Sequence, residues 1–336
     1  MSEPMMPLGP DIADLHYRTY RGESDLPAIV ELMQAARRAN GEQHGISAEQ
    51  LAVHFRNQPR VDPAEDMVLA FVGDRLVARS FIDWARANDG GWQYQSWGDV
   101  HPGWRRRGIG DALWRRNIER LTSIAAEHDH LGKRALVVPF LAEGDVGGAV
   151  LAARLGYRPT RVYRHMTRPD LESIEVPPLP EGLRIRPITA ALLRTVFDGG
   201  VEAFRDHYGV FDASESSYRQ WIESPTTDPT LIVAAFEGQA IAGAVHGEIH
   251  IDENEQHGYQ RGWTDPVWVR RPWRRRGLAS ALLGRALVRL RESGMTSAQL
   301  DVDSDNPNQA LTLYERHGFV ADRTVTEWSM PLARGV

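Results

Sequence analysis

The chain has no cysteine among its 336 residues. This absence excludes disulfides, zinc sites built from thiolates and any acyl-cysteine intermediate, and it fits a cytoplasmic protein. The chain also lacks any run of about 18 apolar residues, so no transmembrane helix is expected. The first ten residues hold three prolines but no basic segment and no apolar core, so no signal peptide is expected either.

The chain also has no excess of positive charge. The formal net charge is −6, which disfavours general nucleic-acid binding, although five arginines gather between positions 270 and 276. That cluster is better suited to a local anion site. A hydrophobic content of 42% and a charged content of 25% are typical of a soluble globular protein. We expect neither a membrane nor a nucleic acid as partner, and no metal site.

Residues 267–283 carry the most informative pattern of the chain. Residues 267–269 favour the end of a β-strand, and Pro272, which offers no N–H to a sheet, ends it. Gly277 then opens a segment whose apolar residues recur at helical spacing. Because a helix N-terminus has unpaired N–H groups and a partial positive charge, this turn predicts a phosphate site.

The same pattern occurs once more, at residues 100–113. Arg105 corresponds to Arg274, so the two copies are 274 − 105 = 169 residues apart. A length well above about 150 residues and an internal repeat both indicate two domains. Residues 169–182 contain four prolines and little periodicity, which is typical of a linker. We therefore expect one domain over 1–168, a linker over 169–182 and a second domain over 183–336.

The two turns resemble the acetyl-CoA pyrophosphate loop of the GNAT N-acetyltransferase superfamily, (Arg/Gln)-x-x-Gly-x-(Gly/Ala). The alternative is a solvated arginine-rich turn. The resemblance implies an α/β fold of the α+β type, with two tandem domains. Each would be a mostly antiparallel sheet of six or seven strands with helices on both faces, and strands four and five would splay apart to admit the cofactor.

The resemblance also implies which residues contact acetyl-CoA. In the second copy they are Val267, Trp268, Val269, Arg274, Arg275, Arg276, Gly277, Leu278, Ala279, Ser280 and Asn306. In the first copy they are Val100, Arg105, Arg106, Arg107, Gly108, Ile109, Gly110 and Asp111. Backbone N–H groups would hold the pyrophosphate, and arginine side chains would meet the remaining phosphate charge.

Tyr314 is the candidate general acid. The segment 306–319 resembles the second cofactor motif of the family, which implies that Tyr314 stands beside the thioester sulfur. A phenol with a pKa of about 10 can protonate a thiolate of similar basicity. The alternative is a half-buried helix aromatic. Aligning Gly156 with Gly318 puts Ala152 at the tyrosine position and Gly144 at the Asn306 position, so we expect the first domain to be catalytically degenerate.

The general base is open between several groups. Asp265 precedes the predicted loop on its strand, and Glu248 and His250 lie on the preceding strand. Each can equally be a salt-bridged or solvated side chain, and a water chain can also serve as base. Without cysteine, direct attack by an amine in a ternary complex is simpler than a covalent relay.

The sequence gives little information about the acceptor. Glu202, Asp206, His207 and Tyr208 lie near the end of the predicted helix 189–204. The acidic residues among them would favour a cationic amine, or the cluster is a solvated helix end. Trp221 and Trp263 line either an acceptor pocket or the core. We expect an N-acetyltransferase acting on a small-molecule primary amine, an aminoglycoside being one possibility. The alternative from another class is a non-catalytic acetyl-CoA sensor.

Overall fold

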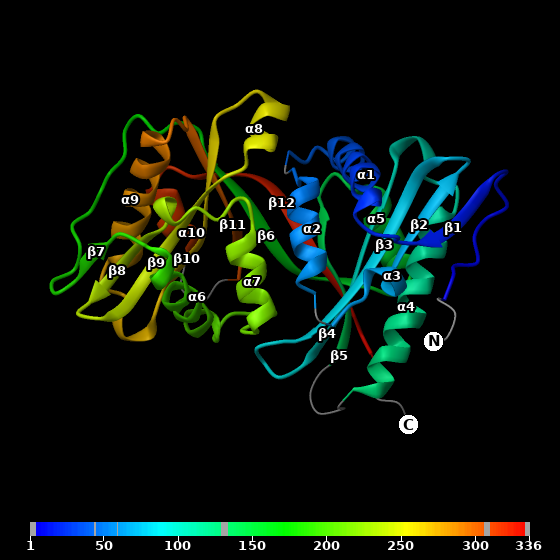
Figure 1. Ribbon diagram of the computed structural model, residues 1–336, viewed down its shortest axis with the longest axis horizontal. Helices are drawn as coiled ribbons and strands as arrows, with labels where there is room; N and C mark the ends of the chain where they lie inside the picture. Colours follow the sequence, from blue (N-terminus) through cyan, green and yellow to red (C-terminus); the bar gives the residue numbers. More distant parts are fainter. Residues whose placement is uncertain (1–4, 44, 59, 129–133, 306–309, 333–336) are drawn as a thin grey trace. The chain divides into compact units, whose positions relative to one another are not determined.

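The computed structural model describes residues 5–43, 45–58, 60–128, 134–305 and 310–332. The chain divides into two compact units, one formed by Met1–Arg161 with Val325–Val336 and the other by Val162–Thr324. Figure 1 shows that each unit is a twisted sheet with helices packed against it. In the described part of the chain, no helix is long and apolar enough to cross a membrane.

The first copy of the repeat supplies strands and helices in mixed order. They are β1 (Leu15–Thr19), η1 (Glu23–Asp25), α1 (Leu26–Ala39), α2 (Ala48–Arg56), α3 (Pro63–Asp66), β2 (Met67–Val72), β3 (Arg75–Arg86), β4 (Trp92–Val100), η2 (Pro102–Trp104), α4 (Ile109–Glu127), β5 (Arg134–Ala142), α5 (Val146–Arg154) and β6 (Arg158–Arg168).

The second copy follows nearly the same order. It comprises β7 (Arg184–Arg186), α6 (Ala190–Phe204), α7 (Glu215–Glu223), η3 (Pro229–Leu231), β8 (Val233–Glu237), β9 (Ala240–Ile249), α8 (Ile251–His257), β10 (Arg261–Val269), η4 (Arg271–Trp273), α9 (Leu278–Glu292), β11 (Ser297–Asp303), α10 (Ala310–Arg316) and β12 (Val320–Pro331).

The two sheets have the same topology. Among the described residues, the first unit orders its strands β1-β2-β3-β4-β5-β12, and the second orders them β7-β8-β9-β10-β11-β6. Only β4–β5 and β10–β11 are parallel among the described ladders within each sheet. The predicted α/β fold with mostly antiparallel sheets is therefore confirmed.

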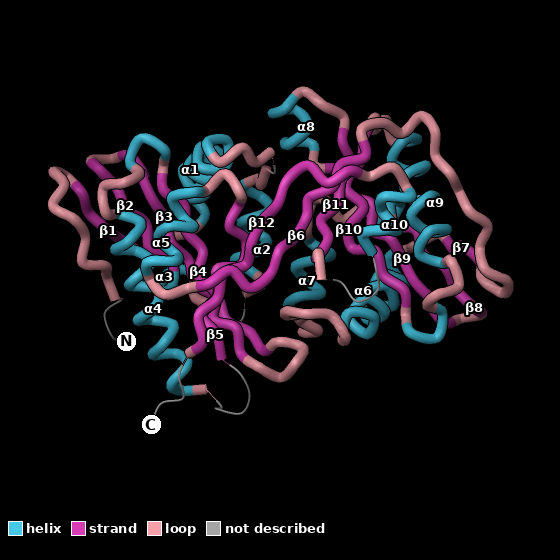
Figure 2. The backbone as a smooth tube through the Cα atoms, turned by 180° about the vertical axis from the view of Figure 1, so that it is seen from behind, coloured by secondary structure: helices cyan, strands magenta, loops and turns pink. Residues whose placement is uncertain are grey.

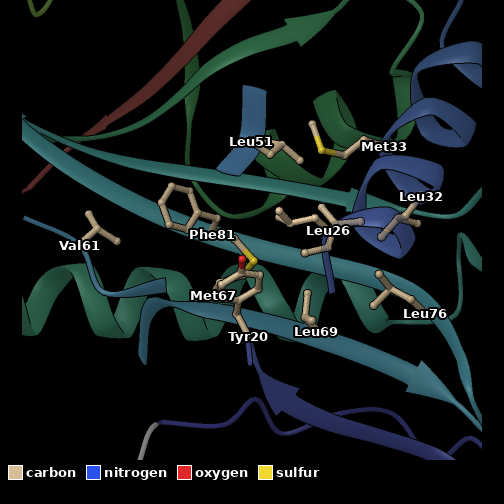
Figure 3. Close-up of a cluster of buried hydrophobic side chains, with 11 residues drawn as sticks. Tyr20, Leu26, Leu32, Met33, Leu51, Val61, Met67, Leu69, Leu76 and Phe81 are labelled. Atoms are coloured by element: carbon tan, nitrogen blue, oxygen red, sulfur yellow. The ribbon is translucent and has the colours of Figure 1, made fainter. Parts of the chain in front are cut away.

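Alternation along the strands places a core on each face of each sheet. In β2, Met67 and Leu69 join the cluster under α1 and α2, which Figure 3 shows, while Val68 and Ala70 pack with Ile109 of α4. The second unit repeats this division, with α6 and α9 packed in different clusters. Successive strand residues point to opposite faces, so both faces need a helical cover.

The compact units depart from the predicted boundaries at two strands. From Tyr163 to Arg168, β6 pairs with β11 of the second unit, as Figure 2 shows. From Val325 to Pro331, β12 pairs with β5 of the first unit. The last strand of each sequence copy thus completes the sheet built mainly from the other copy. The repeat alone cannot reveal this exchange, because both last strands have the same pattern whichever sheet they join.

The proline-rich segment 169–182 forms neither helix nor strand. It is nevertheless packed along the second unit. Leu171 is buried in the core beside Leu283 and Leu287 of α9, and the Pro177 carbonyl accepts a hydrogen bond from Arg285 at 2.8 Å. A side chain on Gly284 would meet the Glu175 carbonyl, so the glycine permits this close approach.

Candidate active site

The loop between β10 and α9 leaves several backbone N–H groups without a helical partner. Its backbone turns at Arg275 (φ 59°) and Gly277 (φ 82°), both left-handed. Helical hydrogen bonding begins with the N–H of Ala281, which donates to the Gly277 carbonyl, so the N–H groups of residues 278–280 lack a helical partner. A β-carbon on Gly277 would face open space. This arrangement suits a phosphate group.

The loop between β4 and α4 has the same backbone geometry. Arg106 has φ 61° and Gly108 has φ 87°, each 169 residues before its counterpart. The helical turns η2 and η4 also stand at equivalent positions. The repeat inferred from the sequence is therefore a repeat in backbone conformation.

The first arginine of each motif stabilises its loop through hydrogen bonds to backbone carbonyls. Arg274 donates to the carbonyls of Val269 at 2.9 Å and Ala203 at 2.8 Å. Arg105 does the same with Val100 at 3.3 Å and Ala36 at 3.2 Å. Each guanidinium thus ties the loop to the end of its strand and to the helix that follows the first strand of its sequence copy, α1 or α6. Arg275 and Arg276 are exposed at the loop itself.

The acidic residues near the end of α6 are partners of this loop. Glu202 forms an ion pair with Arg270 at 2.6 Å, and Asp206 binds Arg271 and, at 3.3 Å, Arg274. These contacts lower the pKa of Asp206, chiefly through the hydrogen bond from Arg271. The two carboxylates are neutralised by arginine, which favours the structural alternative over an acceptor site.

Strands β10 and β11 separate beside the loop. Their parallel pairing runs only from Arg261 to Trp263 and stops at a bulge between Thr264 and Val267. Beyond the bulge, one edge of Val267–Val269 pairs with β9. In the described ladders, the other edge, which faces β11, has no strand partner there. An extended ligand can add to such an edge. The Trp268 side chain is buried against Gly199 and Gly200 of α6, which leaves only its backbone for a ligand.

Tyr314 and Asp265 interact electrostatically, and Asp265 lies just beyond the last paired residue of β10. Tyr314 is buried on α10, and its hydroxyl makes no hydrogen bond to any described residue. Burial raises the pKa of Tyr314 above its ordinary value, and the charge of Asp265 raises it further. Burial likewise raises the pKa of Asp265 to about 8, with additional contributions from the charges of Asp301 and Glu248. Asn306 lies outside the described residues.

Glu248 stands directly across the ladder from Trp263. Its carboxylate contacts the His250 ring at 3.1 Å. His246, on the same strand, is buried; burial lowers its pKa to about 4, so the ring is neutral. Its Nε2 accepts a hydrogen bond from Trp268 at 3.3 Å, and the Trp221 ring lies 5.3 Å away. Trp263 is buried, and Trp221 packs against the buried cluster that includes α6.

Two residues in the surroundings of Asp265 were not singled out in the sequence. Asp301 lies on β11, and His165 on β6 contacts it at 2.9 Å. A single acid between the apolar residues Leu300 and Val302 is a signal for Asp301. No signal identifies His165, because its contact depends on the exchanged strand.

The first unit lacks the equivalent chemical groups. The loop offset and the strand pairing put Ser96 where Asp265 stands, Trp84 where Glu248 stands and Val138 where Asp301 stands. Ala152 takes the position of Tyr314, as the sequence alignment predicts. Ser96 is buried and accepts a hydrogen bond from Asn117 at 2.8 Å. None of these four residues carries a carboxyl group or a phenol.

The first loop is also altered at its helix terminus. Asp111, which replaces Ser280, forms ion pairs with Arg115 at 2.9 Å and Arg154 at 2.5 Å. A carboxylate in the first turn of a helix takes the position that suits an anion. In the second unit Ser280 is neutral, and its hydroxyl contacts His317 Nε2 at 2.7 Å. The residues of the second loop therefore fit a pyrophosphate, and those of the first fit it less well.

Comparison with known proteins agrees with this geometry. The family model described as "Acetyltransferase (GNAT) family" matches residues 200–319. A mycothiol acetyltransferase of Geodermatophilus obscurus is 32% identical over 240 residues, which is 68% of this chain and 71% of that protein.

Solved structures share the fold. The crystal structure of a GCN5-related N-acetyltransferase from Sphaerobacter thermophilus has a TM-score of 0.72 at 24% identity, covering 99% of this chain and 98% of that one. A tandem GNAT protein from the clavulanic acid biosynthesis pathway has a TM-score of 0.68 at 18% identity, covering 96% of this chain and 100% of that one. The chain belongs to the GNAT family and is an acetyltransferase that uses acetyl-CoA.

Proposed function

We propose that the second unit N-acetylates the primary amine of a small molecule, and that the first unit is catalytically inactive. The observation that carries the proposal is the loop between β10 and α9, where the N–H groups of residues 278–280 have no helical partner, and it is supported by the electrostatic interaction between Asp265 and Tyr314. Acetyl-CoA, when bound, supplies the thioester carbonyl that the amine attacks directly. The chain has no cysteine that could carry the acetyl group instead.

Asp265 is the proposed base. A primary amine is mostly an ammonium ion at neutral pH and must lose a proton before it can attack. A carboxyl group with a pKa near 8 takes up such a proton far more readily than an ordinary aspartate. The proton moves to a carboxylate oxygen of Asp265, directly or through one water. Glu248 is the second candidate, but its contact with His250 already uses one of its oxygens.

Tyr314 is the proposed acid. Its raised pKa keeps the hydroxyl protonated throughout the neutral range. Since the hydroxyl makes no hydrogen bond to a described residue, its proton is available to a departing sulfur. In this scheme Arg275, Arg276 and the N–H groups of residues 278–280 hold phosphate charge, while Arg274 keeps the loop in shape.

The relatives named mycothiol acetyltransferase make one acceptor worth testing first. Mycothiol without its acetyl group carries the required primary amine. Other small amines, including aminoglycosides, are tested beside it. The tandem layout with one poorer half also resembles that of mycothiol synthase, which supports the choice of this first acceptor.

The experiment is a transfer assay on the purified chain. Acetyl-CoA is mixed with each amine, free thiol is followed over time, and the product mass is measured. We expect one amine to gain 42 mass units, the mass of an added acetyl group in place of hydrogen. A chain that binds acetyl-CoA but acetylates no amine in a broad panel would favour the non-catalytic sensor instead.

A further inference from the structure

A second carboxylate, that of Asp301, lies like Asp265 just beyond the end of the β10–β11 pairing. Trp263 and Gln299 are the last paired residues of β10 and β11. Asp265 and Asp301 each follow two positions later on these adjacent strands, and Asp265 lies within the bulge between Thr264 and Val267. The two carboxylates are near enough for the charge of Asp301 to act on Asp265.

Asp301 is held in this position by His165. The two residues are opposite one another in the β6–β11 ladder, and His165 Nδ1 lies 2.9 Å from a carboxylate oxygen of Asp301. The carboxylate can only accept a hydrogen bond, so Nδ1 carries the proton. The His165 side chain is only 8% exposed, whereas that of Asp301 is 46% exposed. Without the histidine, Asp301 would be free to turn into solvent.

The His165 ring is itself fixed by its surroundings. It meets Trp263 edge-on, with 5.6 Å between the ring centres. Its Nε2 is buried and has no hydrogen-bond partner among the described residues. The ring therefore has one polar contact, to Asp301, and an aromatic wall. This is the arrangement expected of a residue that orients another group rather than touching the substrate.

We propose that His165 is a positioning residue for the proposed acetyl transfer: it holds Asp301 towards the strand opening, where the Asp301 charge keeps Asp265 suited to accept a proton from the amine. The inference rests on the proposed function. It assigns a role to β6, the last strand of the first sequence copy. The copy that lacks its own acid and base thus supplies a residue that tunes the base of the other.

Other charges also reach Asp265 and set the size of the effect. Glu248 acts on it from β9 and carries His250 as its partner, and Tyr314 approaches it from α10. Removal of Asp301 should therefore lower the pKa of Asp265 without restoring the value of a free aspartate. We expect the change to be about one pKa unit, because a nearby like charge has an effect of that order.

The test is a titration of Asp265 in the free protein. The ¹³C resonance of its side-chain carboxyl is assigned by its loss in Asp265→Asn and is followed from pH 4 to pH 10. We expect Asp301→Asn and His165→Phe each to lower its midpoint by about one unit. His165→Asn retains an N–H near the Nδ1 position and should restore most of the shift. Asp322→Asn is the matched control, because Asp322 contacts Thr167 on the same strand as His165.

The proposal is overturned if the titration midpoint of Asp265 is unchanged in Asp301→Asn and His165→Phe while their amide spectra remain those of a folded protein. If either variant does not fold, the ¹⁵N resonances of His165 in the unmodified protein test the proposal instead, because they show which ring nitrogen carries the proton. A proton on Nδ1 supports the proposal, and a proton on Nε2 alone overturns it. If the titration behaves as expected while no amine is acetylated, the effect of His165 and Asp301 on Asp265 stands, and the proposed acetyl transfer is what fails.

Discussion

Pro10 lies against Gly108, with its nearest carbon 3.3 Å from the position that a β-carbon on Gly108 would take. The contact belongs to an N-terminal segment that is fixed at a second point, where the Met5 carbonyl accepts a hydrogen bond from Arg116 at 2.9 Å. Gly277, at the equivalent place in the second unit, faces open space. The two loops therefore share a backbone conformation but not the same access to it.

From this difference we predict one acetyl-CoA site per chain. The segment around Pro10 and the carboxylate of Asp111 both disfavour a pyrophosphate at the first loop. Isothermal titration calorimetry of the unmodified chain should give a stoichiometry of about one. Gly108→Glu should leave the affinity and the stoichiometry unchanged. Two sites, one of them lost in Gly108→Glu, would show that the first unit retains a cofactor.

Acetyl-CoA affinity should be far more sensitive to a substitution at Gly277 in the second loop. Gly277→Glu forces a side chain into a left-handed conformation and puts a carboxylate beside the phosphate position. At an effective dielectric constant near 20, a like charge about 4 Å away costs about 4 kcal/mol, so acetyl-CoA affinity should fall by roughly 100-fold or more. Gly277→Asn is the control, since asparagine tolerates this conformation and adds no charge. Equal losses in both variants would mean that backbone strain, rather than repulsion, is responsible.

The sequence predicted the parts of the fold that depend on local pattern. The hairpins, the glycine turns and the helices after them lie where hydrophobic spacing and turn residues indicate. The short helix α8 between β9 and β10 was missed because its sequence, from Ile251 to His257, is mostly polar and carries no apolar stripe. The exchanged strands were missed because partner choice is a long-range property.

The candidate site likewise contains residues that local motifs predict and residues whose surroundings depend on long-range packing. Gly277 and Tyr314 follow from motifs in the sequence. Asp265 was one of several candidates, and its perturbed pKa depends on Asp301 and Glu248, which only the strand arrangement brings near. Glu202 and Asp206 suggested an acceptor site, yet the fold pairs them with arginines of the loop. Charged residues cannot be assigned to ligand or partner until their neighbours are known.

Tyr314→Phe should lower kcat while leaving the protein folded. The change removes only a hydroxyl that has no hydrogen bond to a described residue, so the buried ring keeps its packing. General acids contribute about 100-fold to 10,000-fold, and we expect kcat to fall within that range with little change in acetyl-CoA affinity. Tyr157→Phe makes the same chemical change in the core of the first unit and should keep full activity. Unchanged turnover in Tyr314→Phe would remove the tyrosine from the mechanism.

Asp265 should make the protein less stable as the pH rises. Its pKa is raised from 3.8 to about 8 by burial and by neighbouring carboxylates, so the folded state resists the ionisation that the unfolded state accepts. Below about pH 4 the group is protonated in both states and costs nothing. The cost grows from there and is complete above about pH 8, where both states are ionised.

Asp265→Asn removes that cost and should raise Tm at pH 9 by roughly 10–20 °C, given a pKa that rises from 3.8 to about 8, about 1.4 kcal/mol per pKa unit and about 2–4 °C per kcal/mol for a unit of this size. The difference from the unmodified protein should shrink as the pH falls and vanish near pH 4. The same variant should lose the acidic limb of the kcat/KM profile together with most of its activity. Melting curves at pH 4, 6, 8 and 9 measure the effect, with Asp322→Asn as the matched exposed carboxylate. A stabilisation that is the same at every pH would mean that the substitution acts through packing and that Asp265 titrates normally.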